Sequence, residues 1–243
     1  MQIDDFITLM KKRRSIRRFR PGTPIPDEHV NKMLEAARWA MSGGNGQPWQ
    51  FVVVRDQETK NRIAEASMAT RNEQWIIEKT RLPEMMHPQH GRPPESASYR
   101  TAQLLIVVLT DRRRYQATAL SPLYVPGPGE ATGTYIQSGA NACHTICLAA
   151  AALGYASQWS TMVRIWHEAI KEILDIPVIL DVMVVIPIGY PDYEPKSVYR
   201  RELKEMVHYE KYDRTREESG EDIVKWVSRL RDMTKPDYRQ AEE

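Results

Sequence analysis

A run of basic residues near the N-terminus holds the chain's most concentrated chemistry. Residues 12–19 read Lys-Arg-Arg-Ser-Ile-Arg-Arg-Phe, which surrounds one hydroxyl, Ser15, with cationic side chains. A guanidinium presents a planar fork of donors that binds phosphate or carboxylate in a bidentate manner. The apolar Ile16 and Phe19 indicate that the run is anchored in a fold. It therefore predicts an anion site, although a basic cluster at a helix end also pairs with the carbonyls of the last turn.

The overall composition confines any such site to a local patch. The chain has 243 residues, 34 of them basic and 32 acidic, with a formal net charge of +2. This balance gives no global field that attracts nucleic acid or membranes. No run approaches the roughly 18 apolar residues of a membrane helix, and the N-terminus lacks the layout of a signal peptide. With Cys143 and Cys147 inside an apolar run, these features predict a cytoplasmic protein without disulfides.

Other familiar ligand sites have little support. No phosphate loop of the form G-x-x-x-x-G-K-[ST] occurs, and no strand precedes the glycines at 127–133 to make them a dinucleotide fingerprint. His87 and His90 lack a third ligand at a metal-binding spacing, and His144 points away from the helix face that the cysteines share. No nucleophile lies in a recognisable catalytic motif. The sequence predicts neither a metal nor a catalytic dyad.

Apolar periodicity predicts an α+β protein. The expected strands are continuous apolar runs that span residues 49–55, 104–109, 156–159 and 178–188. The expected helices span residues 4–11, 27–41, 57–69, 72–81, 133–153 and 164–174, and a last one starts at Ser219. The helix at 133–153 is small and apolar nearly all round, which predicts burial in the core or against a second subunit.

A single domain over residues 1–243 is the economical interpretation, because the chain has no internal repeat and no disordered linker. Two irregular segments, about 71–99 and 112–132, are long enough to be functional lids. A C-terminal extension follows at about 208–243. The candidate lid-lining residues are Arg71, Trp75, Tyr115 and Tyr124.

Several segments, taken together, suit one ligand with a phosphate at one end and a flat, polar heteroaromatic at the other. They are the Arg13–Arg17 cluster, the turns 42–49 and 157–161, and the pair Arg200–Arg201. This set resembles the nitroreductase family of FMN-dependent oxidoreductases. The matching motifs are R-R-S-I-R-R-F at 13–19, S-G-G-N-G-Q-P-W-Q-F-V-V-V at 42–54, G-A-N-A-C-H-T-I-C-L-A-A-A-A-L-G-Y at 139–155, I-P-I-G-Y-P at 186–191 and R-R-E-L-K-E-M-V at 200–207.

The resemblance implies a three-layer α+β fold, with a central, mostly antiparallel sheet flanked by helices, and an intertwined homodimer. It also implies a role for each matching residue toward FMN. The residues expected to hold the phosphate and ribityl chain are Arg13, Arg14, Ser15, Arg200 and Arg201. Those expected to reach the flavin from the other subunit are Ser42, Gly43, Asn45 and Gln47. Those expected to line the isoalloxazine edge are Trp159, Ser160 and Thr161.

Arg17 and Thr161 are the residues that the resemblance places nearest the chemistry. Arg17 matches a basic residue near flavin N1 and O2, where reduction adds negative charge, and Thr161 contributes backbone groups near N5. The implied reaction is ping-pong: NADH or NADPH reduces the flavin, and a nitroaromatic, quinone-like or other electron-poor molecule then oxidises it. The alternatives are a specialised member such as a reductive dehalogenase, or a non-catalytic flavin- or nucleic-acid-binding protein.

Overall fold

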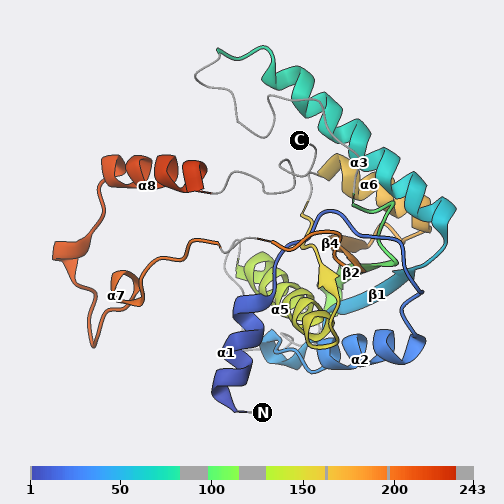
Figure 1. Ribbon diagram of the computed structural model, residues 1–243, viewed down its shortest axis with the longest axis horizontal. Coiled ribbons are helices and arrows are strands. Elements are labelled where there is room, and N and C mark those ends of the chain that lie inside the picture. The colour runs from blue at the N-terminus through green and yellow to red at the C-terminus, as the bar shows by residue number, and fades with distance from the viewer. Residues whose placement is uncertain (1, 83–97, 115–129, 162–163, 196–197, 234–243) are drawn as a thin grey trace. The chain divides into compact units, whose positions relative to one another are not determined.

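The computed structural model describes residues 2–82, 98–114, 130–161, 164–195 and 198–233 (Figure 1). The chain divides into two compact units, Met1–Asp192 and Tyr193–Glu243. The first unit carries the sheet and most of the helices. A single domain over the whole chain, with lid-like excursions and a C-terminal extension, stays a prediction.

A four-stranded antiparallel sheet of order β1-β2-β4-β3 forms the centre of the first unit. The strands are β1 (Trp49–Val54), β2 (Leu104–Asp111), β3 (Ala156–Ser157) and β4 (Leu180–Gly189). Every residue of β2 is buried. A strand that is covered on both faces needs apolar side chains at every position, which is why β2 reads as a continuous apolar run.

Helices cover both faces of this sheet (Figure 1). On one face, α2 (Asp27–Arg38) and α5 (Glu130–Ala152) share a buried cluster with alternate residues of β2 and β4. On the other face lie α3 (Gln57–Glu78) and α6 (Arg164–Leu174), while α1 (Ile3–Lys12) contacts α5. The three-layer α+β arrangement expected from the sequence is confirmed.

Small residues let α5 lie close to the sheet. Ala142, Ile146 and Ala150 are fully buried, and both cysteines of this helix are buried and free. Burial raises the pKa of the Cys147 thiol, which keeps it protonated and unreactive. The helix ends before Gly154, whose φ of 84° is the left-handed conformation that favours glycine at a helix end.

Gly139 of α5 packs tightly against β2 and β4. A Cβ at this position would lie 2.8 Å from Thr110 Cγ2 and 3.1 Å from Met183 Cε. We therefore expect Gly139→Val to lower the free energy of unfolding by about 1–3 kcal/mol through overpacking. Ala140→Val, next along the same helix, is the matched control for β-branching. Urea denaturation of both variants checks the prediction, and equal losses would contradict it.

Several element boundaries differ from those expected. The helices predicted at 57–69 and 72–81 are one helix, α3, in which Thr70 Oγ1 donates to Ala66 O (3.1 Å). This bond satisfies the hydroxyl inside the helix, so the polar residues around Thr70 do not end it. The strand expected to start at Val178 begins instead at Leu180.

The second unit consists of short elements and one longer helix. They are α7 (Leu203–Met206), the 3₁₀ turn η3 (Arg214–Arg216) and α8 (Gly220–Met233). A capping box begins α8: the Ser219 N–H donates to Asp222 Oδ2 (3.0 Å) and the Asp222 N–H donates to Ser219 Oγ (3.2 Å). Ile223 in the first turn of this helix is 44% exposed.

Candidate active site

The basic arm, residues 13–19, runs beside the end of the sheet formed by β3 and β4. The Ile16 N–H donates to Ser157 O (3.1 Å), and Ser15 forms a parallel bridge with Ser157. Ile16 and Phe19 are 3% and 2% exposed, so both apolar residues of the arm are anchored as the sequence indicated. The arm is therefore held against the first residues of the 157–161 turn.

Arg13 lies beside the C-terminal half of α5. Partial burial, followed by the positive charge of Arg13, lowers the pKa of His144. The same charge opposes the rise that burial causes in the pKa of Cys147. Arg13 and Ser15 are half-buried, and within the described part of the chain no carboxylate pairs with Arg13. An anion placed here would meet an uncompensated positive potential.

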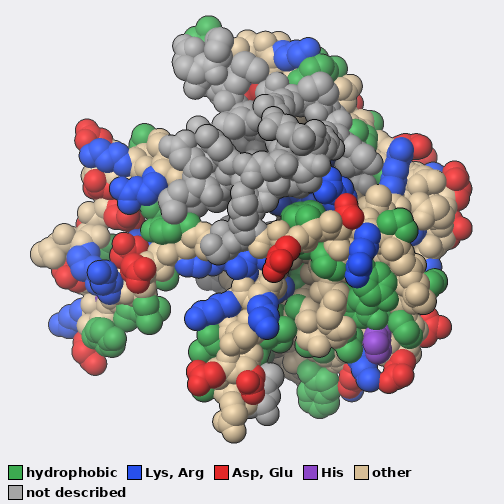
Figure 2. Space-filling model, in the orientation of Figure 1, with side chains coloured by type: hydrophobic (Ala, Val, Ile, Leu, Met, Phe, Trp, Pro, Cys, Tyr) green, Lys and Arg blue, Asp and Glu red, His purple; other side chains and the backbone are tan. Residues whose placement is uncertain are grey.

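The other arginines of the arm differ in their surroundings. Arg14 Nη1 donates to the carbonyls of Lys11 and, at 2.9 Å, of Arg13, which is the helix-end pairing that the sequence left open. Arg18 Nε pairs with Asp192 Oδ2 at 2.7 Å. Arg17 is exposed. Figure 2 shows Lys and Arg side chains gathered over the C-terminal end of α1, where the arm begins.

The turn 157–161 is fixed against β4. The Gln158 N–H donates to Pro187 O (3.2 Å), and the Val185 N–H donates to Ser160 O (3.3 Å). Ser160 is buried, Trp159 is half-buried and packs on the core, and Thr161 is exposed. The structure thus brings together the arm and the 157–161 turn, which the sequence assigned to opposite ends of one ligand.

The glycine turn, residues 42–47, is held at the N-terminal half of α5. It contains the 3₁₀ turn η1 (Gly43–Asn45), and the Gly43 N–H donates to Ser138 Oγ (3.2 Å). Within the turn, the Gln47 N–H donates to Ser42 Oγ (3.1 Å). Asn45 and Gln47 have φ values of 51° and 44°, in the left-handed region that most residues avoid. Such conformations persist where the surrounding contacts impose them, which marks the turn as a functional candidate.

Within one chain, the glycine turn and the basic arm contact different parts of α5. The turn contacts Ser138 on α5, whereas Arg13 lies beside His144 and Cys147. A helix rises about 1.5 Å per residue with 3.6 residues per turn, so Ser138 and Cys147 lie about 14 Å apart along α5 and on opposite faces. The two halves of the predicted site therefore face different directions in a single subunit.

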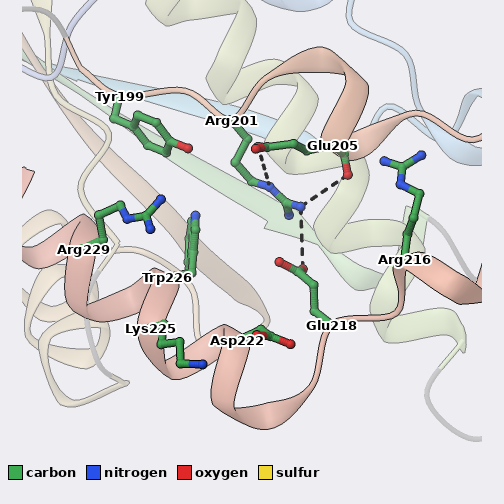
Figure 3. Close-up of a pocket in the computed structure, with 9 residues that line it drawn as sticks. All are labelled: Tyr199, Arg201, Glu205, Arg216, Glu218, Asp222, Lys225, Trp226 and Arg229. Carbon is green, nitrogen blue, oxygen red and sulfur yellow. Dashed lines mark hydrogen bonds and ion pairs between the residues drawn. The ribbon is translucent and has the colours of Figure 1, made fainter.

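Arg200 and Arg201 belong to the second unit. Arg201 pairs with Glu218 Oε2 (3.6 Å) and Glu205 Oε2 (3.7 Å) and lines a charged pocket (Figure 3). Arg200 is exposed and donates to Tyr199 O (2.9 Å). The ion pairs of Arg201 connect α7 to the segment before α8. A role for either arginine toward a phosphate stays a prediction.

The lid candidates are only partly described. Tyr115 and Tyr124 lie outside the described residues. On α3, Arg71 is exposed and Trp75 is half-buried, with Lys79 Nζ 3.7 Å from the centre of its ring. The assignment of these residues to a lid stays a prediction.

Two side-chain contacts of the candidate site were not predicted from the sequence. Ser98 donates to Gln158 Oε1 (2.5 Å), and the Tyr99 hydroxyl shares a hydrogen bond with Ser160 Oγ. Both residues follow a proline-rich segment, and each is about sixty positions from its partner. No local pattern signals such a contact.

Other kinds of site find no support in the described residues. No three His, Cys, Asp or Glu side chains gather there to hold a metal ion. Within the same ranges, no helix has both the length and the apolar character required to cross a membrane.

Comparison with known proteins identifies the family. A protein of Archaeoglobus fulgidus with the provisional name NADH dehydrogenase/NAD(P)H nitroreductase is 29% identical over 215 residues, which cover 86% of this chain and 100% of that protein. Iodotyrosine deiodinase 1 of Rattus norvegicus is 43% identical over 65 residues, 27% of this chain and 22% of that one. The NADPH:FMN oxidoreductase of Vibrio harveyi, solved with NAD⁺, is 21% identical with a TM-score of 0.67, over 94% of this chain and 85% of that chain. Residues 10–190 match the model of the Nitroreductase family, so the chain belongs to the nitroreductase family.

Proposed function

We propose that this chain is an FMN-dependent oxidoreductase that takes hydride from NADH or NADPH and reduces nitroaromatic, quinone-like or other electron-poor small molecules by a ping-pong mechanism. The observation that carries the proposal is the bond from the Ile16 N–H to Ser157 O (3.1 Å), which joins the basic arm to the 157–161 turn. The cationic side chains of the arm and the polar groups of the turn are then close enough to contact one ligand.

The residues of the basic arm and of the 157–161 turn suit FMN. The half-buried Arg13 has no carboxylate partner among the described residues, and Ser15 adds a hydroxyl beside it, which matches the oxygens of a phosphate. The residues of the 157–161 turn would line the edge of the ring. When bound, FMN supplies the capacity to accept two electrons as hydride and to pass them on. Arg17 would stabilise the negative charge that reduction adds, as a fixed cation does best in a poorly solvated site.

The active form that we propose is a homodimer in which the glycine turn of one subunit completes the arm site of the other. The opposed positions of turn and arm on α5 support this arrangement. So do large apolar side chains that one chain leaves exposed on α1, at the end of α2 and on α5. They are Ile3 (68%), Ile7 (41%), Met10 (37%), Trp39 (75%), Met41 (80%) and Ile136 (41%). Exposed apolar surface of this extent is typical of a protein–protein interface.

Reductive dehalogenation is the second candidate reaction, favoured by the local likeness to iodotyrosine deiodinase 1. It would use the same flavin and differ in the acceptor. Nucleic-acid binding by the basic arm is disfavoured by the net charge of +2. We propose a cytoplasmic location, where NADH or NADPH would be the electron donor.

The visible absorption spectrum of the purified protein tests the proposal. We expect a yellow protein, or one that turns yellow with added FMN, that bleaches under anaerobic NADH or NADPH. Reoxidation by a panel with a nitroaromatic, a quinone and an iodinated phenol then distinguishes the two candidate reactions. A protein that takes up no FMN would refute the flavin assignment. A yellow protein that neither donor reduces would refute the NAD(P)H step.

A further inference from the structure

Two side-chain contacts, one buried and one partly buried, hold the 157–161 turn from the side of α3 and α6. The Ser98 hydroxyl donates to Gln158 Oε1 (2.5 Å), and Tyr99 shares a hydrogen bond with Ser160 Oγ. Ser98, Tyr99 and Ser160 are 7%, 3% and 6% exposed. These bonds are additional to the backbone bonds that join the turn to β4. They reach the two side chains that flank Trp159.

The Tyr99 ring has little freedom. It packs against Trp166 of α6, with ring centres 5.5 Å apart and an interplanar angle of 37°. Burial raises the pKa of the Tyr99 hydroxyl, and interactions with Ser160 and Ser67 and the charge of Arg71 oppose that rise. Ser67 is 1% exposed. The Tyr99 hydroxyl therefore stays protonated and is buried beside Ser160, where an unmet hydrogen bond is costly.

We propose that Tyr99 is a positioning residue that fixes Ser160, and with it the 157–161 turn, in the arrangement that receives the flavin ring. The proposal rests on the proposed function, because it concerns the same site. A hydroxyl has one hydrogen to donate and two lone pairs that accept. Either hydroxyl can donate in this bond; with Tyr99 as the donor, the hydrogen of Ser160 remains available for a ligand against the turn. An oriented dipole of this kind needs no reorganisation when charge develops beside it.

Tyr99→Phe isolates this effect, because it keeps the ring that packs on Trp166 and removes only the hydroxyl. Reduction adds negative charge to the flavin, so a less ordered donor disfavours the reduced form. We expect stoichiometric FMN binding by the variant. The equilibrium constant for two-electron reduction should fall about tenfold, which corresponds to a midpoint potential lower by about 30 mV. A spectroelectrochemical titration measures it.

A double-mutant cycle with Ser160→Ala tests whether Tyr99 acts through Ser160. We expect Tyr99→Phe to add no further shift of the potential once Ser160 is alanine. Tyr155→Phe is the matched control: Tyr155 is also buried, and its hydroxyl hydrogen-bonds His29 Nδ1 (2.7 Å) on the other face of the sheet. We expect the Tyr155→Phe protein to have a lower free energy of unfolding and a flavin midpoint potential equal to that of the wild type.

The outcomes separate this inference from the proposed function. A wild-type chain that takes up no FMN refutes both. A flavin-loaded Tyr99→Phe protein with the wild-type potential, or with a shift that adds fully to that of Ser160→Ala, refutes the positioning role alone. If Tyr99→Phe does not fold, Ser160→Ala removes the same hydrogen bond from the other partner and is expected to lower the potential. An unchanged potential in that variant then refutes the inference.

Discussion

Replacement of Arg13 by alanine is expected to yield a folded protein that loses FMN during purification. Arg13 is the half-buried cation that lies where the arm meets α5. A charge-assisted hydrogen bond is worth about 1.5–3 kcal/mol, so the dissociation constant for FMN should rise about 10- to 100-fold. Quenching of flavin fluorescence on titration with apoprotein measures it.

Lys12→Ala is the control for Arg13→Ala, because Lys12 is an exposed cation next along the chain. It should leave FMN binding within about twofold, as expected for a charge screened by water. A second measurement needs no flavin. Since the charge of Arg13 lowers the pKa of His144, the variant should raise that pKa in an NMR titration of the apoprotein. A raised pKa together with unchanged FMN affinity would contradict the phosphate role and leave the position of Arg13 intact.

The fold followed from the sequence where burial dictates residue type over several consecutive positions. β2 is buried on both faces and so had to be apolar throughout, which made its existence predictable. The C-terminal boundary of α5 was also predictable, because Gly154 adopts the left-handed conformation that is favoured just after a helix. The break expected within α3 was wrong, since Thr70 satisfies its hydroxyl on the carbonyl of Ala66.

The candidate site was predictable as a set of segments but not as an arrangement. The basic arm was visible as an unusual local composition, and the 157–161 turn was assigned through the family resemblance; the bond between Ile16 and Ser157 brings them together. The contact of Tyr99 with Ser160 had no local signal. Tyr99 and Ser160 lie 61 positions apart in the sequence, and Tyr99 also packs on Trp166. Long-range polar contacts depend on the tertiary fold, which periodicity does not encode.

Ile136→Glu is expected to convert the proposed dimer into monomers and to prevent FMN binding at the same time. Ile136 is 41% exposed on α5, two residues before the Ser138 hydroxyl that holds the glycine turn. In a symmetric dimer each change occurs twice in the interface, and an unpaired carboxylate cannot be buried there without large cost. We expect a loss of at least about 3 kcal/mol, or 100-fold in the dimer dissociation constant. Sedimentation velocity measures it.

The control and a mass-action test distinguish loss of the dimer from loss of the fold. Ile179→Glu makes the same replacement at a site that is 50% exposed, just before β4 begins, and should keep both the dimer and the FMN. Because a site built from two subunits binds FMN only in the dimer, high concentrations of FMN should restore dimers of Ile136→Glu. Monomers of this variant that retain stoichiometric FMN would contradict a shared site. An Ile136→Glu protein that stays dimeric would place the interface elsewhere on the chain.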